Sequence, residues 1–249
     1  MITRVLLGLT LLIFVLPACA QQPTPEPTPT VDPLVADTSP KPVEMQTRDN
    51  VTIKGTYYPP PNPQTRSPAI LLVHMLDNTK ESWQDFAIAA QDAGYAVLAI
   101  DLRGHGESDG SQTFEKMDND LDTALFWLIA RPETDGERIG IAGASIGANL
   151  AIRGGSRYPQ VKSVVMLSPA LDYRGLTSAE ALSNYGQRAT MIVATEKDTL
   201  SADPARTLNS RALGQHQLQI YPGSDHGTNI FKAQAGLKPM MLAWFKSTL

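Results

Sequence analysis

Hydrophobic and polar residues alternate over two short stretches, Val43–Thr47 and Val51–Tyr58, with Asp49-Asn50 between them. This pattern predicts two antiparallel strands joined by a turn. After Pro59-Pro60-Pro61, apolar runs recur without alternation, which is typical of parallel strands covered on both faces. These predicted strands are 69–73, 95–100, 139–142, 161–167, 190–194 and 216–221.

Between the apolar runs lie stretches whose hydrophobic residues recur about every 3.6 positions, the period of an α-helix. The predicted helices are Ser82–Ala93, Met117–Ala130, Ile146–Arg157, Ala202–Leu213 and Ala235–Lys246. Strands that alternate with helices predict a doubly wound α/β fold, with a mostly parallel sheet and a leading antiparallel hairpin. Ligand sites in such sheets lie at the carboxyl ends of the strands. We therefore expect functional residues in the segments 74–78, 101–110, 143–147 and 196–200.

The first residues have the composition of an export signal. Arg4 precedes the apolar run Val5–Leu16, which is shorter than the about 20 residues of a membrane span. Leu16-Pro17-Ala18-Cys19 resembles the lipobox of bacterial lipoproteins, which implies cleavage before Cys19 and lipid attachment to it. A Pro/Thr-rich stretch follows, typical of a semi-rigid spacer.

From this N-terminal pattern we predict a signal peptide over 1–18, a tether over 19–42 and a folded domain over 43–249. The protein is then expected outside the cytoplasm, anchored through Cys19 to the bacterial cell membrane. The alternative is a secreted protein whose ordinary signal is cut after Ala18 or Ala20.

Composition narrows the class of protein. The chain has 249 residues, of which 42% are hydrophobic, so one sizeable α/β domain with a full core is expected. The net charge is −4 and no basic patch stands out, which argues against a nucleic-acid partner. Cys19 is the single cysteine and excludes both an intramolecular disulfide and a cysteine-based zinc site. We expect no metal ion and no cofactor.

Gly143-Ala144-Ser145-Ile146-Gly147 lies between a predicted strand and a predicted helix. Such a turn exposes the serine hydroxyl, and the helix N-terminus behind it offers free backbone N–H groups to an anion. The flanking glycines allow strand and helix to approach closely. The pattern G-x-S-x-G in this context is a signature of serine hydrolases.

A serine nucleophile needs a base and a group that orients the base. Of the four histidines, His226 lies in a glycine-rich loop after the last predicted strand. Asp198 follows the strand before it, with Glu196 as the reserve candidate for the acid. The order Ser145, Asp198, His226 is the one found in α/β-hydrolases. We consider Asp225 a poorer acid, because a residue seldom points at its neighbour's ring.

From about Val43 onward the chain resembles the α/β-hydrolase superfamily, especially small esterase-like members related to dienelactone hydrolase and the serine aminopeptidases. The motifs that carry the resemblance are 72–76, 101–108, 143–147, the Asp198 segment and 223–227. The resemblance implies Ser145 as nucleophile, His226 as general base and acid, and Asp198 as the group that orients His226. It also implies an oxyanion hole formed by the backbone N–H of Ile146 and of Leu76, with Met75 second for the latter. Dienelactone hydrolase itself uses a cysteine, so Ser145 argues against that activity.

Other residues of these motifs have simpler interpretations. We expect a structural role for His74 and loop-ordering hydrogen bonds for Asp101 and Arg103. Only residues 169–188 separate two predicted strands where relatives insert a lid, so no substantial lid domain is expected. The open site is predicted to be lined in part by Leu76, Leu171, Tyr173 and Tyr185.

These features predict a serine hydrolase, a carboxylic ester hydrolase that acts on a small ester or acyl substrate through an acyl-enzyme. The alternatives are a peptidase or acyltransferase on the same fold, or a non-catalytic surface-tethered binding protein. The sequence leaves the oligomeric state undetermined.

Overall fold

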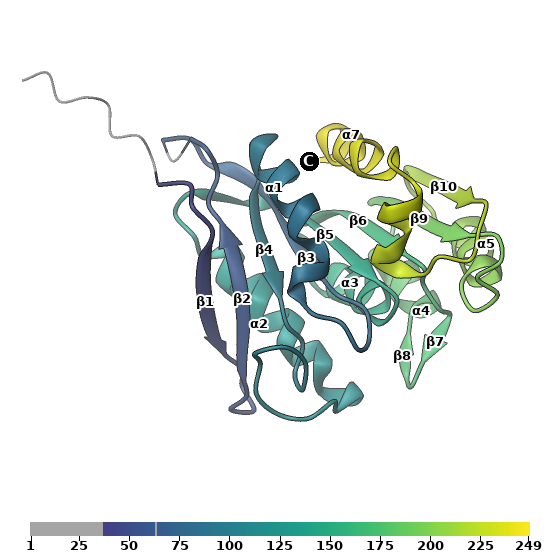
Figure 1. The fold of residues 1–249 in the computed structure, drawn as a ribbon, viewed down its shortest axis with the longest axis horizontal. Coiled ribbons are helices and arrows are strands. Elements are labelled where there is room, and N and C mark those ends of the chain that lie inside the picture. Colours follow the sequence, from purple (N-terminus) through teal and green to yellow (C-terminus); the bar gives the residue numbers. More distant parts are fainter. Residues whose placement is uncertain (1–36, 63) are drawn as a thin grey trace, which may run out of the picture. The chain divides into compact units, whose positions relative to one another are not determined.

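The computed structural model describes residues 37–62 and 64–249 (Figure 1). Its centre is an eight-stranded sheet in the order β1-β2-β4-β3-β5-β6-β9-β10. The pairs β1–β2 and β2–β4 are antiparallel, and all others are parallel. The predicted fold class, with its leading antiparallel hairpin, is confirmed. The predicted signal peptide and most of the predicted tether lie outside the described residues.

The strands of the main sheet have clear bounds. They are β1 (Lys41–Gln46), β2 (Thr52–Tyr58), β3 (Ser67–Val73), β4 (Ala96–Ile100), β5 (Thr134–Ala144), β6 (Val161–Leu167), β9 (Ala189–Thr195) and β10 (His216–Tyr221). The strand β1 begins at Lys41 rather than at Val43. The strand β5 is longer than predicted because its first residue, Thr134, pairs with Ser67 on β3.

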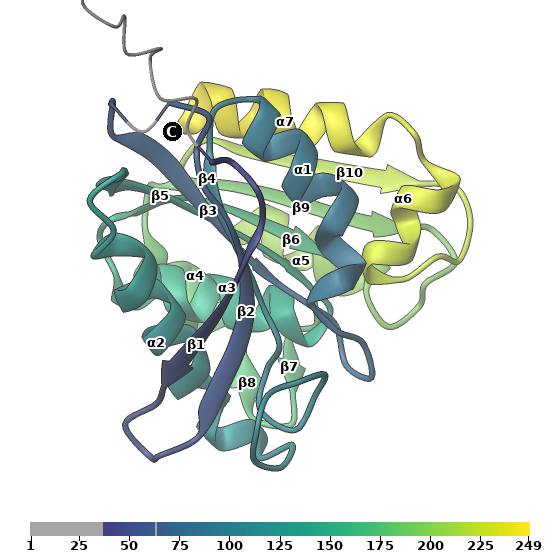
Figure 2. The same cartoon turned by 60° about the vertical axis from the view of Figure 1, so that its left-hand side comes forward.

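Helices cover both faces of the sheet (Figure 2). On one face lie α1 (Gln84–Asp92), α6 (Ile230–Ala233) and α7 (Leu237–Thr248). On the other lie α2 (Met117–Ile129), α3 (Ile146–Arg157), α4 (Ala179–Tyr185) and α5 (Ala202–Arg211). Short 3₁₀ helices are η1 (Lys80–Trp83), η2 (Phe114–Lys116) and η3 (Gly227–Asn229). The predicted helix from Ser82 therefore consists of η1 followed by α1.

The apolar run of β3 is uninterrupted because helices cover the strand on both faces. Ile70 and Leu72 pack with α1 and α7, whereas Leu71 and Val73 pack with the helices of the other face. All four side chains are fully buried. A strand covered on both faces cannot carry polar residues on alternate positions, so alternation is lost.

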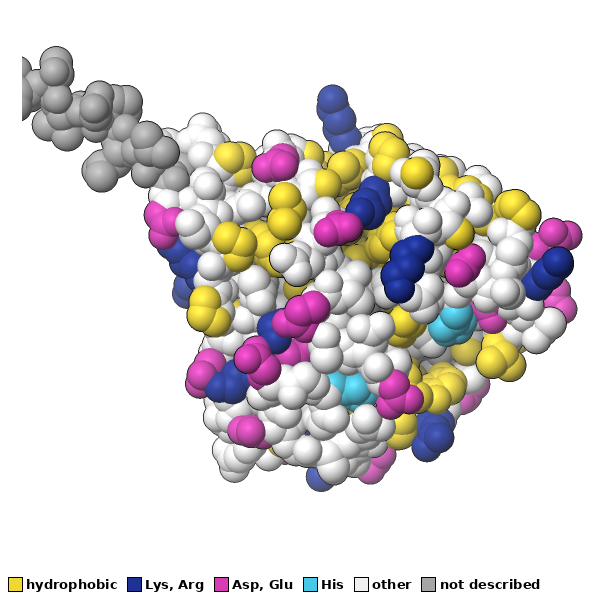
Figure 3. All heavy atoms as spheres, viewed as in Figure 1, with side chains coloured by type: hydrophobic (Ala, Val, Ile, Leu, Met, Phe, Trp, Pro, Cys, Tyr) yellow, Lys and Arg dark blue, Asp and Glu magenta, His cyan; other side chains and the backbone are white. Residues whose placement is uncertain are grey.

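Residues 169–188 form a two-stranded hairpin, β7 (Asp172–Tyr173) with β8 (Leu176–Thr177), and the short helix α4. This confirms that no substantial lid domain is inserted there. Within residues 37–62 and 64–249, no helix has both the length and the apolar character needed to cross a membrane. On the face shown in Figure 3, acidic and basic side chains are interspersed rather than gathered by sign.

Candidate active site

Ser145 occupies the turn between β5 and α3 in a strained backbone conformation, with φ 52° and ψ −117°. Glycines on both sides make this turn possible. A β-carbon at Gly143 would lie 2.0 Å from the carbonyl oxygen of Gly147. One at Gly147 would lie 2.4 Å from the carbonyl oxygen of Val73 on β3. The half-buried Ser145 is therefore held at the carboxyl edge of the sheet by contacts that only glycine permits.

His226 and Asp198 meet at the same edge, although 28 residues separate them in the chain. Nδ1 of His226 lies 2.7 Å from Oδ2 of Asp198. The Asp198 side chain is 7% exposed and that of His226 is 36% exposed. If Nδ1 donates its hydrogen to the carboxylate, Nε2 of the neutral ring is left as a proton acceptor.

The two alternative acids, Glu196 and Asp225, have different surroundings. Glu196 is exposed. The backbone carbonyl of Asp225 accepts a hydrogen bond from Oγ1 of Thr195. Of the three candidate acids, Asp198 is therefore the one that is hydrogen-bonded to the ring of His226 in the described part of the chain.

Ser145 and His226 open into one cavity of about 230 Å³. No hydrogen bond between their side chains is recorded in the described part of the chain. Catalytic Ser–His hydrogen bonds often tighten only when substrate binds. The cavity is lined by Met75, Leu76, Ser145, Ser168, Ala170, Tyr173, Leu200, Ser201 and His226.

The predicted lining is correct in part. Leu76 and Tyr173 line the cavity, whereas Leu171 and Tyr185 do not. The prediction for Tyr185 is wrong because α4 directs this residue into the core. Tyr185 is 1% exposed, and its hydroxyl donates a hydrogen bond to the carbonyl oxygen of Ala189. Burial raises its pKa.

The sequence reasoning placed Met75 and Leu200 within the expected segments 74–78 and 196–200 without naming them as lining residues, and it missed Ser168, Ala170 and Ser201. Two of the missed residues have sequence positions that could have indicated them. Ser168 directly follows the buried strand β6, and Ser201 lies in the turn between β9 and α5. Both are at carboxyl ends of parallel strands, where sites of such sheets occur.

The predicted oxyanion donors lie at the start of α3 and just after β3. Ile146 is the first residue of α3, so its N–H has no acceptor within the helix. Leu76 and Met75 follow β3 and both line the cavity. Within the described residues, no hydrogen bond is recorded for the backbone N–H of any of the three. The choice of Leu76 over Met75 stays a prediction.

Both ring nitrogens of His74 contact backbone atoms, as expected for a structural role. Its Nδ1 lies 2.7 Å from the carbonyl oxygen of Met75, and its Nε2 lies 2.9 Å from the backbone nitrogen of Leu102. Burial lowers the pKa of His74 to about 4, so the ring is neutral near pH 7. With both nitrogens engaged, it links the ends of β3 and β4.

Asp101 and Arg103 order the loop after β4, as predicted. Asp101 is fully buried and accepts hydrogen bonds from the backbone N–H and from Nζ of Lys80. Arg103 is bound to Asp120 and to Asp49. The hydrogen bond from Arg103 holds the pKa of Asp49 well below its usual range.

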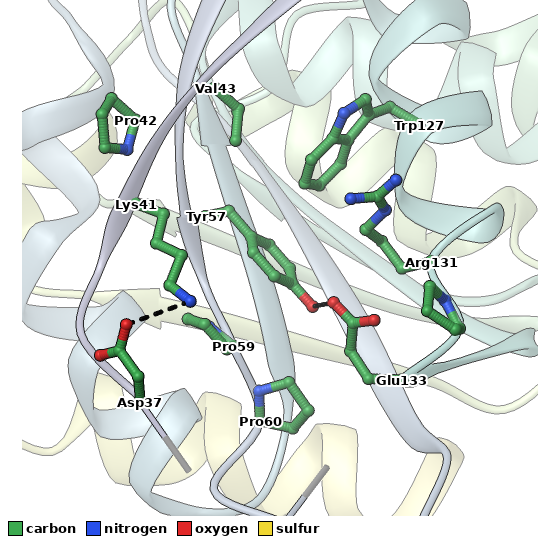
Figure 4. Close-up of a pocket in the computed structure, with 11 residues that line it drawn as sticks. Asp37, Lys41, Pro42, Val43, Tyr57, Pro59, Pro60, Trp127, Arg131 and Glu133 are labelled. Atoms are coloured by element: carbon green, nitrogen blue, oxygen red, sulfur yellow. Dashed lines mark hydrogen bonds and ion pairs between the residues drawn. The ribbon is translucent and has the colours of Figure 1, made fainter.

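A larger cavity, about 680 Å³, lies at the opposite edge of the sheet, beside the start of β5 (Figure 4). There the Tyr57 hydroxyl donates to Glu133, and the Arg131 guanidinium lies 4.4 Å from the centre of the Trp127 ring. Burial, together with Glu133, raises the pKa of Tyr57. None of Ser145, Asp198 and His226 lines it, so the smaller cavity is the candidate active site.

Comparison with known proteins places the chain among hydrolases. A family model described as serine aminopeptidase, S33, matches residues 64–190. An acyltransferase of Aspergillus calidoustus, drtE, is 30% identical over 184 residues, which cover 72% of this chain and 58% of that protein. The chain thus spans less than two thirds of the length of this relative.

Two solved structures share the fold. The esterase Pf2001 of Pyrococcus furiosus superimposes with a TM-score of 0.72 at 21% identity, covering 85% of this chain and 93% of the other. A dienelactone hydrolase of Anabaena variabilis gives a TM-score of 0.71 at 20% identity, covering 85% and 98%. At these identities the likeness concerns the fold.

Proposed function

Since the chain belongs to the serine aminopeptidase (S33) family of hydrolases, we propose that it is a serine hydrolase whose activity is carboxylic ester hydrolysis. The observation that carries the proposal is the arrangement of three side chains. His226 is hydrogen-bonded to Asp198 at 2.7 Å, and it opens into the same cavity as the strained Ser145.

In the proposed reaction, Oγ of Ser145 attacks the ester carbonyl carbon while Nε2 of His226 takes the hydroxyl proton. Asp198 holds the ring orientation and stabilises the imidazolium. The carbonyl oxygen becomes an oxyanion, which the N–H groups of Ile146 and Leu76 stabilise. Collapse expels the alcohol with a proton from His226. Water then attacks the acyl-enzyme, with His226 as base, and releases the acid.

The lining of the cavity favours an uncharged substrate. Its residues include no aspartate, glutamate, lysine or arginine. An aminopeptidase must receive the charged amino group of its substrate, and burial of a charge without a partner is costly. The apolar lining from Met75, Leu76 and Leu200 suits a short acyl group instead.

The test uses p-nitrophenyl esters of increasing acyl length and a fluorophosphonate probe. We expect turnover and labelling of the wild type and loss of both in Ser145→Ala. Ser111→Ala, which removes an exposed serine, is the matched control. Wild-type protein that neither reacts with the probe nor hydrolyses any ester would refute the proposal.

Two related activities are separated by the same assay. Aminoacyl p-nitroanilides report a peptidase. Added alcohol acceptors report an acyltransferase, the activity named for the Aspergillus calidoustus relative. We expect the esters to be the better substrates and water to be the main acceptor.

We also propose that Cys19 carries a lipid and anchors the enzyme outside the cytoplasm. The support is the sequence pattern around Cys19, since residues 1–36 lie outside the described part. Stable anchoring needs more than one acyl chain. Mass spectrometry of the N-terminal peptide after expression in bacteria should show a lipidated Cys19, and Cys19→Ala should leave the membrane fraction. An unmodified N-terminus that starts after Ala18 or Ala20 would favour secretion.

A further inference from the structure

The loop that carries His226 is held at three successive residues by side chains from other strand ends. We call residues 222–227 the His226 loop. Oγ1 of Thr195, the last residue of β9, donates to the carbonyl oxygen of Asp225 at 2.7 Å. The N–H of Gly227 donates to Oγ of Ser168, which follows β6, at 3.0 Å. Between these two contacts, Asp198 binds the ring of His226.

The His226 loop has little conformational preference of its own. Gly223 and Gly227 both have positive φ, at 110° and 58°, in a region where glycine is needed. A glycine-rich loop loses much conformational entropy when it is fixed. Backbone hydrogen bonds from Lys197 to Gly223 and from Asn229 to His226 hold part of the loop, but they leave the carbonyl of Asp225 and the N–H of Gly227 to side-chain partners.

Ser168 has features beyond those of an ordinary core serine. It is 1% exposed, lines the cavity and has φ 50°, in the left-handed region that serine seldom adopts. Its own N–H donates to the carbonyl oxygen of Val193 on β9, which fixes the turn. Strained backbone of this kind persists where surrounding contacts enforce it, and it occurs often at functional sites. Thr195 is fully buried.

We propose that Ser168 and Thr195 are positioning residues that clamp the His226 loop from both sides and so hold its imidazole for proton transfer. The inference rests on the proposed function, since it assigns His226 the role of base. It predicts that loss of either hydroxyl lowers kcat. KM should stay unchanged in Thr195→Val, because Thr195 does not line the cavity, whereas Ser168 lines it and its test rests on kcat and on exchange of the Gly227 amide.

The variants are Ser168→Ala, Ser168→Gly and Thr195→Val. Ser168→Gly also removes the hydroxyl, but glycine tolerates φ 50°, so this variant separates loss of the bond from backbone strain. Misplacement of a catalytic group by about 1 Å can cost roughly 100-fold in rate, so we expect a fall in kcat approaching that size. Thr195→Ser keeps the hydroxyl and should retain most of the wild-type kcat.

Matched controls lie on the same strands. Ser163 on β6 is fully buried and accepts a hydrogen bond from Nε1 of Trp244 at 2.9 Å. Thr190 on β9 is 1% exposed. Ser163→Ala and Thr190→Val remove buried hydroxyls near the amino ends of β6 and β9, away from the carboxyl ends that carry Ser168 and Thr195. They should lower thermal stability without changing kcat or KM.

A readout independent of activity is amide hydrogen exchange by NMR. Loss of the Ser168 hydroxyl should speed exchange of the Gly227 amide, and the Ser163→Ala control should not. Unchanged kcat in an active wild-type background, or unchanged Gly227 exchange, would overturn the clamp. A wild type without esterase activity but with faster Gly227 exchange in Ser168→Gly would refute the proposed function and retain the clamp.

Discussion

Nδ1 of His226 lies 2.7 Å from Oδ2 of Asp198, and the carboxylate is nearly buried while the ring is partly open to solvent. A buried carboxylate beside Nδ1 favours the tautomer that carries hydrogen on Nδ1, because that hydrogen then has an acceptor. In that tautomer of the neutral ring, Nε2 is the proton acceptor that the proposed reaction needs.

Asp198→Asn tests this relationship. The amide can donate to Nδ1 and so favours the wrong tautomer, which in a serine protease triad lowers kcat about 10⁴-fold. We expect a loss of that order in ester turnover with unchanged thermal stability. Asp225→Asn and Glu196→Gln should retain activity. A large loss in either control with an active Asp198→Asn would reassign the orienting acid.

The sequence could place the three proposed catalytic residues because each lies at a strand end. The apolar runs locate the strands, and parallel strands bring their carboxyl ends to one edge. Ser145, Asp198 and His226 therefore converge without knowledge of any side-chain contact. The same logic holds for Leu76, which the structure also places on the cavity.

Contacts that depend on the path of irregular segments could not be predicted this way. The orientation of α4 sends Tyr185 into the core, and no local pattern fixes that orientation. The bond from Gly227 to Ser168 joins residues 59 apart in the chain, so it follows from strand order and loop geometry together. Hydroxyl contacts leave no periodic signal in the sequence.

Gly147→Ala should damage the fold. The new β-carbon would lie 2.4 Å from the carbonyl oxygen of Val73 and 2.6 Å from that of His74, and both are backbone atoms that cannot turn away. Overpacking of this kind costs about 1–3 kcal/mol or more of unfolding free energy. Urea denaturation followed by circular dichroism measures the loss. Gly236→Ala, where nothing lies within 4 Å of the added carbon, should be neutral or stabilising.

Lys80 and Asp101 form a buried ion pair, with Nζ 2.7 Å from Oδ2 and side-chain exposures of 6% and 0%. Lys80→Met leaves the Asp101 carboxylate without its cation, and removal of one partner of such a pair costs about 3–5 kcal/mol. We expect a loss of that order in urea denaturation. Lys238→Met breaks a pair with the exposed Asp85 and should cost about 1 kcal/mol or less. Equal losses in both variants would show that the burial of Asp101 has no energetic consequence.

His74 should make the fold less stable in acid. Burial lowers its pKa to about 4 in the folded protein, against about 6.5 in the unfolded chain. Between these values the unfolded chain binds more protons, so the unfolding free energy falls as the pH drops from 6.5 to 4. The loss from this one group is about 3 kcal/mol at most.

His74→Gln isolates this contribution, because its amide can still donate to Met75 and accept from Leu102 but does not titrate in this range. Unfolding free energies of wild type and variant should be measured in urea at pH 7 and pH 4.5. We expect the advantage of the wild type at pH 7 to shrink or reverse at pH 4.5. His216→Gln, which removes an exposed histidine, controls for the loss of an imidazole as such. Parallel pH dependence of wild type and His74→Gln would mean that His74 takes up no extra proton on unfolding.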